Sequence, residues 1–411
     1  MNDRLLSILV IILLWTPIAY SQENVQKDSV AVADTTTTPS LPTDIYASLL
    51  IAEPDNDFYS AFGHCAVRLC CPSKKLDFCY TYCLEESLAN QLALFNGSGK
   101  GAYSAVATPT FVQEYIEHGR KVEDYRLNLT TEQVRQLWQI LDNEITSGAY
   151  RQYNYLHTNC SSMSLFAVER CLGSDEIVWR NLGEGITGTY RTFVKTISEG
   201  SPWVKFVWTT LLGHEGESLG TMEHKMGPTL LAPVLASSQV KSADGTLRPL
   251  LAENQPQLVN KGTLQHTHSW FTPNALFLLL FILAAITATL EAGGKARTWT
   301  RVFCAMMLIM QTLAGLIITY ITVISDMTGA SFNTNLLILN PIPAIMWLAA
   351  RHRTWYNKVW TVYSAVLCVY IAMWLVTPQV DFTHVLMALL LLTICLSKTL
   401  TYRKQHKSNK L

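Results

Sequence analysis

The sequence predicts two parts of different fold class: an exported α+β domain, followed by an all-α bundle of about five transmembrane helices. Three observations predict this division. A short apolar run follows a basic residue at the N-terminus, the middle of the chain alternates strand-like and helix-like runs, and the last third is almost continuously apolar. Of the 411 residues, 49% are apolar and 15% are charged, and the net charge is zero. No basic face stands out, so we expect no nucleic-acid partner.

The first 21 residues follow the pattern of a signal peptide. Arg4 supplies the positive end, residues 5–15 form the apolar run, and residues 19–21 form a small-residue cleavage site. An uncleaved anchor would export the chain in the same way. The next residue is Gln22 and not Cys, so we do not expect the chain itself to be a lipoprotein. Residues 22–43 are polar, Thr-rich and contain two prolines, which predicts a linker.

The predicted membrane domain spans residues 271–398 and precedes a basic tail at 399–411. Five apolar stretches lie in it, each near the length that crosses the hydrocarbon of a bilayer, although the third and fifth are short. These stretches are 274–290, 302–324, 335–350, 358–376 and 382–397.

The loops between the apolar stretches predict the orientation. Lys and Arg occur in loops 291–301 and 351–358 and in the tail, whereas loops 325–334 and 377–381 contain neither. By the positive-inside rule the basic set is cytoplasmic, so the N-terminal domain lies outside a bacterial inner membrane. The signal peptide predicts the same orientation.

The outer boundary of the third stretch is rich in amides, with the pattern N-T-N-L-L-I-L-N-P at 333–341. One interpretation is a lip that faces lipid or substrate. The alternative is helix capping and hydrogen bonding between helices.

Residues 44–270 predict the exported domain. Short β-leaning runs occur at 45–52, 63–71, 76–83 and 121–129. Thr130 and Gln133 form a capping-box pattern ahead of apolar residues at helical spacing, and a second helix is predicted near Cys160 with Thr158 or Asn159 as N-cap. Residues 228–266 read as a further irregular or β segment.

Seven cysteines lie in the exported domain, and an odd number leaves at least one free thiol in an oxidising compartment. Five of them fall within 65–83, where we expect disulfide bridges between neighbouring strands. Their spacing does not match a zinc ribbon, so no metal site is predicted.

Two short segments carry residues for chemistry. The first is S-A-F-G-H-C-A-V-R at 60–68, which places His64 and Arg68 on one face of a strand. The second is Y-N-Y-L-H-T-N-C-S-S at 153–162, which ends at a predicted helix start. A Cys in the first turn of a helix has a lowered thiol pKa, and a nearby imidazole can take its proton. One interpretation pairs Cys160 as nucleophile with His64 as base. The alternative is that Cys160 is a bridged or buried thiol and His64 a structural residue of the turn. His118 and His157 are expected to be surface or structural residues.

Taken together, F-G-H-C-A-V-R-L, L-N-L-T, Y-N-Y-L-H-T-N-C-S-S, S-P-W-V-K-F and L-L-G resemble the periplasmic domain of the Lnb-type family of Bacteroidetes-like bacteria. The resemblance covers roughly residues 44–260 and extends to the amide-rich pattern at 333–341. It implies a lipoprotein N-acyltransferase whose exported domain is similar to circularly permuted papain-like hydrolases of the NlpC type. In permuted members the His strand precedes the Cys helix, as His64 precedes Cys160 here.

Carried over to this sequence, the resemblance makes Cys160 the nucleophile and His64 the base, without any cofactor. It also implies a third, orienting polar residue on the strand after the His, where this sequence offers Tyr80, Thr81 and Tyr82 instead of a His, Asn or Gln. Arg68 is a substitute orienter, a ligand of a lipid phosphate, or a strand-surface arginine. Ser60, Asn159 and the backbone N–H of Cys160 are candidates for the oxyanion hole or for orientation.

The implied reaction is acyl transfer from a phospholipid, through a thioester on Cys160, to the N-terminal amine of a lipid-anchored lipoprotein. Two alternatives stay open. A periplasmic cysteine peptidase or amidase acting on cell-wall peptide would use the same Cys160–His64 pair. A non-catalytic membrane receptor or assembly factor would need neither residue.

Overall fold

The computed structural model describes residues 43–55, 60–85, 87–179, 188–217, 227–253, 256–263, 270–295, 297–348 and 353–408. The predicted signal peptide and nearly all of the predicted linker lie outside the described residues.

The N-terminal part is built on a seven-stranded sheet in the order β10-β5-β1-β2-β3-β4-β6, in which every pairing is antiparallel. Three of the four predicted strand runs coincide with β1, β2 and β3, and the fourth with β5. The strands are β1 (Tyr46–Ala52), β2 (His64–Cys71), β3 (Leu76–Leu84), β4 (Lys100–Ala107), β5 (Val122–Arg126), β6 (Arg151–Gln152) and β10 (Gln257–Asn260).

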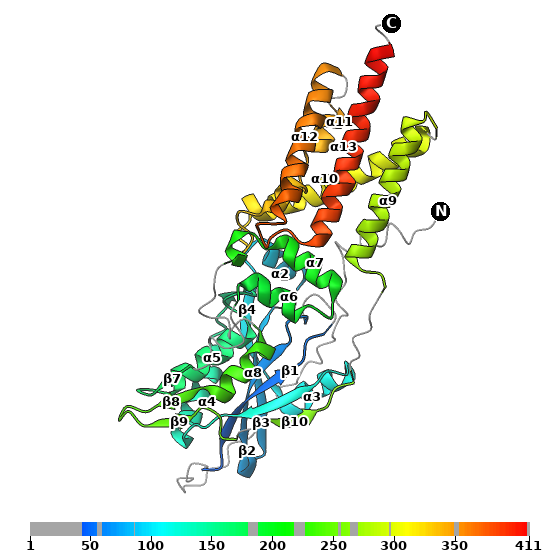
Figure 1. Cartoon of the computed structure of the whole chain (residues 1–411). Coiled ribbons are helices and arrows are strands. Elements are labelled where there is room, and N and C mark those ends of the chain that lie inside the picture. The colour runs from blue at the N-terminus through cyan, green and yellow to red at the C-terminus, as the bar shows by residue number, and fades with distance from the viewer. Residues whose placement is uncertain are drawn as a thin grey trace. The chain divides into compact units, whose positions relative to one another are not determined.

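Helices cover both faces of this sheet (Figure 1). Helix α3 (Thr108–Glu117) packs on the face that carries Ala66 and Cys79. Helices α4 (Thr131–Thr146), α5 (Cys160–Cys171) and α8 (Pro228–Ser237) pack on the opposite face. The side chains of β2 and β3 alternate between the two faces, so neighbouring residues of one strand enter different cores. The remaining helices of this part are α2 (Leu88–Phe95), α6 (Tyr190–Ile197) and α7 (Pro202–Leu211).

Both predicted helix starts are confirmed. Thr130 and Gln133 form a reciprocal capping box at the start of α4, and Asn159 caps α5 in the same manner with Ser162. Each box satisfies backbone N–H groups that have no partner inside the helix, which contributes about 1 kcal/mol.

The segment 228–266 differs from the sequence prediction because it opens with a helix. Pro228 occupies the first turn of α8, where its missing N–H costs nothing, and the apolar residues that follow pack against the main core. The chain then forms β8 (Gln239–Lys241) and β9 (Leu247–Pro249), which join β7 (Glu176–Val178) in a separate three-stranded sheet.

The predicted disulfides are wrong: all ten cysteines are free thiols. The strand register gives the reason. Cys70 lies opposite Asp77, Cys79 opposite Arg68, and Cys83 opposite Ala102, so no strand pair brings two cysteines face to face.

The described residues of the C-terminal part form helices, and three of these are long and apolar enough to cross a membrane: Pro273–Ala292, Thr298–Val323 and Phe382–Thr401. The third predicted stretch is broken near Asn340 and Pro341 into a 3-10 turn and a seven-residue helix, and the apolar part of the fourth, 357–373, is shorter than a span. Helix α13 packs against both α9 and α12 (Figure 1). The elements are α9 (Pro273–Ala292), α10 (Arg297–Val323), η4 (Thr334–Leu337), α11 (Ile342–Leu348), α12 (Arg353–Met373) and α13 (Phe382–Ser408).

The amide-rich pattern at 333–341 is structural, which confirms the capping interpretation over the lip. Asn333 donates through Nδ2 to the backbone oxygens of Thr210 and Leu211 at 2.7 and 3.1 Å, and Asn335 donates to the Thr210 oxygen at 3.1 Å. Both amides are buried. They therefore satisfy the last carbonyls of α7 and fasten this helix to the C-terminal part.

Backbone hydrogen bonds reinforce this junction. The N–H of Gly213 donates to the oxygen of Gly329 at 2.7 Å, and that of His214 to Ser331 at 2.9 Å. The approach is close enough that a Cβ at position 213 would lie 1.9 Å from the Ser331 oxygen. Only glycine fits this position without a shift of the backbone.

We expect Gly213→Ala to lower the free energy of unfolding by about 2 kcal/mol, because the added methyl collides with backbone that cannot rotate away. Gly293→Ala is the matched control, since a Cβ there meets only ordinary contacts at 3.7 Å. Thermal unfolding of the full chain in detergent measures both. Equal melting temperatures for the two variants would contradict the close junction.

Candidate active site

Helix α5 begins at Cys160, and the preceding residue, Asn159, is its N-cap. Asn159 Oδ1 accepts hydrogen bonds from the backbone N–H groups of Ser161 and Ser162 at 2.9 and 3.0 Å, and its Nδ2 donates to the Tyr155 oxygen at 3.1 Å. All of these groups are buried or partly buried. Asn159 is thus fully engaged as a cap and acts by fixing where the Cys160 side chain begins.

The Cys160 thiol lies against the beginning of β2. Burial raises its pKa above the ordinary value of 9.0, and the backbone N–H of Cys65 interacts with the sulfur and opposes that rise. The sequence predicted a lowered pKa from the helix N-terminus, so the net direction is a correction. In this dry position desolvation of the thiolate outweighs the helix dipole. The resting group is a neutral thiol beside the peptide bond that joins His64 to Cys65.

His64 is the first residue of β2 and is partly exposed. Gly63 before it has a φ of 81°, and a Cβ there would lie 2.7 Å from the Ala52 oxygen, so a glycine is required where the chain turns into the strand. This turn pairs His64 with Ala52 and sets which face the imidazole occupies.

The His64 imidazole contacts two side chains of β3. Its Nε2 lies 2.5 Å from Thr81 Oγ1 and 3.9 Å from Cys83 Sγ, and these two atoms are 3.2 Å apart. The rings of Phe111 and Tyr115 lie beside it, with centroids at 6.0 and 6.5 Å. Desolvation, helped by the charge of Arg120, lowers the His64 pKa from 6.5 to about 4. The imidazole is therefore neutral at pH 5–8.

The His64 side chain and the Cys160 thiol, which belongs to α5, lie at the beginning of β2 but on different sides of the strand. Cys160 packs with Cys65 in the core under α5, whereas Ala66, two residues from His64 and on its face, packs under α3. In the part of the chain that the structure describes, the hydrogen-bond partners of the imidazole are on β3 and its aromatic neighbours are on α3, and what it shares with Cys160 is the 64–65 peptide.

Of the three candidates on the strand after the His, Tyr80, Thr81 and Tyr82, it is Thr81 whose side chain contacts His64. Tyr80 and Tyr82 alternate to the other face and belong to the main core. Tyr82 is fully buried, stacks with Tyr153 at 5.9 Å, and donates to the Arg151 oxygen at 3.5 Å. Its hydroxyl therefore supports the core beneath α5 and does not orient the imidazole.

Arg68 does not join the site either. Its Nε and Nη2 bind both carboxylate oxygens of Asp77 at 2.8 and 2.6 Å, and its Nη1 binds Asp124 at 2.6 Å. The guanidinium is thus engaged in an ion-pair network four residues along the strand from His64. The backbone oxygen of Ser60 accepts hydrogen bonds from Asp55 and Gly63, which closes the turn before β2.

The loop that leads into Cys160 packs against the C-terminal part. A small apolar pocket lies there, lined by Tyr153, Tyr155, Leu156, Trp208, Leu212 and Met327, among others. His157 in this loop contacts Tyr190 at 3.3 Å and Glu215 at 3.9 Å, while His118 binds the Glu114 oxygen. Both histidines therefore make local structural contacts. Among the described residues, no cluster of three His, Cys, Asp or Glu side chains is arranged to hold a metal ion.

Comparison with known families agrees with this division of the chain. Residues 34–185 match the family described as the Lnb N-terminal periplasmic domain, and residues 265–406 match the Lnb transmembrane domain. The chain belongs to the Lnb-type family. Searches of curated proteins and of solved structures found no match.

Membership in the Lnb-type family makes the chain a membrane-anchored protein of lipoprotein maturation with a periplasmic N-terminal domain. The N-terminal match contains His64, Thr81, Cys83 and Cys160. The C-terminal match contains the loop that meets the Cys160 segment.

We expect alkylation of Cys160 by iodoacetamide to keep rising as the pH increases beyond 9, because burial keeps the thiol protonated until then. Peptide mass spectrometry of protein labelled at a series of pH values measures the rate for this cysteine alone. A rate that levels off between pH 4 and 7 would show instead a preformed thiolate–imidazolium pair.

We expect Thr81→Val to slow any reaction in which His64 accepts a proton, by about tenfold, because the imidazole loses the hydroxyl that orients it. Thr81→Ser retains the hydroxyl and serves as control. Single-turnover acylation of Cys160 measures the effect, with thermal unfolding as the check on folding. Equal rates for the two variants would show that the Thr81 hydroxyl does not orient the His64 imidazole.

Proposed function

We propose that the protein is a lipoprotein N-acyltransferase that uses Cys160 as nucleophile and His64 as general base. It takes an acyl chain from a phospholipid and transfers it to the α-amine of a diacylglyceryl lipoprotein. The observation that carries the proposal is that the buried neutral thiol of Cys160 lies against the backbone N–H of Cys65, one residue along β2 from the neutral imidazole of His64, in a chain of the Lnb-type family.

In the first half-reaction, His64 accepts the Cys160 proton while the sulfur attacks the ester carbonyl of the phospholipid. The carbon–sulfur bond forms, and the bond to the glycerol oxygen breaks as that oxygen takes the proton from the imidazolium. A thioester and a lysophospholipid result. The pKa of His64, lowered to about 4, keeps the imidazole in the accepting form, and Thr81 supports Nε2 as the positive charge develops. Catalytic hydrogen bonds are often long before substrate binds, so the 64–65 geometry is compatible with this transfer.

In the second half-reaction the lipoprotein amine attacks the thioester. An amide bond forms, the carbon–sulfur bond breaks, and the amine proton returns by way of His64 to the sulfur. The apolar surroundings of Cys160 favour this outcome, because water must be kept from the thioester until the amine arrives.

Contacts with the C-terminal part support lipid substrates. The loop before Cys160 shares its pocket with Met327, and Tyr320 at the end of α10 donates to Asn96 at 2.5 Å. Both substrates of the proposed reaction are anchored in one leaflet, so a nucleophile next to a membrane loop meets them where they lie. A peptidase acting on cell-wall peptide would gain nothing from this arrangement.

The finer topology belongs to the same proposal. The order of His strand before Cys helix, on an antiparallel sheet, is what a circularly permuted papain-like domain requires. We further propose five membrane segments with a cytoplasmic basic tail in the inner membrane, on the charge pattern of the loops.

Intact-mass analysis of a lipoprotein N-terminus tests the function in a strain that lacks this gene and then carries it on a plasmid. We expect one added acyl mass with the wild-type gene and none with Cys160→Ser or His64→Ala. Cys171→Ser is the matched control, a buried cysteine at the other end of α5. A hydroxylamine-sensitive acyl group on Cys160 would support the thioester.

The proposal would be overturned if lipoproteins from the Cys160→Ser strain carried the same added acyl mass as those from the wild-type strain, with the variant protein present in the membrane. Altered cell-wall peptides with unchanged lipoproteins would favour a peptidase, and no change of either kind would favour a receptor or assembly role.

A further inference from the structure

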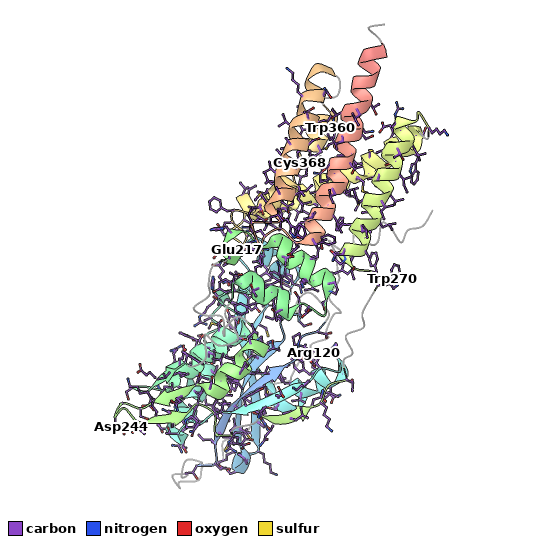
Figure 2. The ribbon with its side chains drawn as sticks, viewed as in Figure 1. Arg120, Glu217, Asp244, Trp270, Trp360 and Cys368 are labelled. Carbon is purple, nitrogen blue, oxygen red and sulfur yellow. The ribbon has the colours of Figure 1, made fainter. Side chains whose placement is uncertain are left out.

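A buried arginine stands close to His64 with part of its hydrogen-bonding capacity unused. Arg120 follows α3 (Figure 2) and is 6% exposed. Its Nε donates to the backbone oxygen of Glu53 at 2.7 Å, but its Nη2 is buried and, within the described part of the chain, has no hydrogen-bond partner. A buried charged donor without an acceptor is unfavourable, so its retention calls for an acceptor that arrives from outside.

No ion pair between the Arg120 guanidinium and an acidic side chain is recorded among the described residues. Glu53 contacts Arg120 through its backbone oxygen, and its carboxylate accepts from the backbone N–H of Lys121 at 3.3 Å. A buried cation next to a reactive site favours the binding of an anion.

A column of side chains connects this cation to the reacting groups. The Arg120 guanidinium carbon lies 4.7 Å from the centre of the Tyr115 ring, and that ring is stacked on His64 with an angle of 13° and a centroid distance of 6.5 Å. The cation is therefore one aromatic ring away from the proposed base. An anion held on Arg120 would lie on the side of β2 that carries the proposed base.

We propose that Arg120 binds the phosphodiester of the phospholipid acyl donor. This inference rests on the proposed function and deepens it. The phosphodiester is the anion that a phospholipid carries on the same glycerol as its acyl esters, and the planar guanidinium fork suits its oxygens. Arg68, the arginine that the sequence indicated for this role, has its donors committed to Asp77 and Asp124.

Binding and reaction are coupled in this arrangement. The positive charge of Arg120 helps to lower the His64 pKa. A bound phosphate offsets that charge, so the imidazole becomes a stronger base when the donor is in place. The lysophospholipid retains the phosphate as it leaves, and its departure restores the original state before the amine substrate arrives.

Single-turnover acylation of Cys160 tests the proposal with two donors in detergent micelles: a phosphatidylethanolamine, and the 4-nitrophenyl ester of the same fatty acid, which has no phosphate. We expect Arg120→Gln to slow acylation by the phospholipid by about 10- to 100-fold, as for loss of a charge-assisted contact, and not to slow acylation by the nitrophenyl ester, which has no phosphate to lose. Arg120→Lys keeps the charge without the fork and should fall between.

Arg126→Gln is the matched control. Arg126 also lies over a tyrosine, 4.4 Å from the centre of the Tyr46 ring, but it is exposed on β5. We expect it to react with both donors as the wild type does. An equal loss with both donors in Arg120→Gln would assign Arg120 a structural role and overturn the proposal, as would unchanged rates with both.

A binding measurement on the full chain separates this proposal from the proposed function. We expect glycerophosphoethanolamine to raise the melting temperature of the wild type and not of Arg120→Gln. A shift with inorganic phosphate alone, without one from the headgroup compound, would assign the site to free phosphate and overturn the donor assignment. If neither donor acylates Cys160 in the wild type, the acyltransferase fails, while the melting shift still decides whether Arg120 binds the phosphodiester.

Discussion

The whole site depends on one peptide unit, the bond between His64 and Cys65 at the beginning of β2. Its N–H faces the Cys160 sulfur, and the residue on its other side carries the imidazole. In a strand, a shift of one residue sends every side chain to the opposite face. Gly63 prevents such a shift, because its positive φ and its contact with the Ala52 oxygen set the residue at which the strand begins.

The site combines two groups that both prefer the neutral state. Desolvation raises the pKa of the Cys160 thiol and lowers that of the His64 imidazole, so no charge separates before substrate binds. This arrangement suits an apolar substrate that brings little water with it. A resting thiolate would need solvent or a permanent countercharge, and the core beneath α5 supplies neither. In the resting site, therefore, the thiol and the imidazole are both uncharged, and the Thr81 hydroxyl is a polar group in contact with the imidazole.

Local patterns in the sequence were enough for the helix starts and for most of the sheet. The capping boxes at Thr130 and Asn159 are local, so their residues can be read without knowing the rest of the fold. The cysteine bridges failed because proximity in sequence does not determine which residues face each other across two strands. The partners Thr81 and Cys83 become visible only with that register, which pairs Ala66 with Thr81 and continues to place Cys83 beside His64.

The role of Arg120 and the partners of Arg68 could not be predicted from the sequence, for a different reason. Arg120 reaches His64 through Tyr115, and neither lies in a recognisable motif. Arg68 does lie in the motif, yet its distant partner Asp124 cannot be foreseen from spacing. The demand for an acceptor appears only when burial and hydrogen bonds are known for each donor.

The junction between α7 and the C-terminal part also depends on polar groups that need hydrogen-bond partners. A helix end leaves carbonyls without partners, and at the end of α7 the amides of Asn333 and Asn335 satisfy them. Because these contacts are buried and directional, they hold α7 in a defined position, and α7 supplies Trp208 to the pocket beside the Cys160 loop. The nucleophile loop is therefore positioned from two sides, by its own cap at Asn159 and by a helix fastened to the membrane segments. The helix beside this loop cannot move away from the C-terminal helices without first breaking buried hydrogen bonds, and this holds the Cys160 segment next to the membrane-anchoring part of the chain.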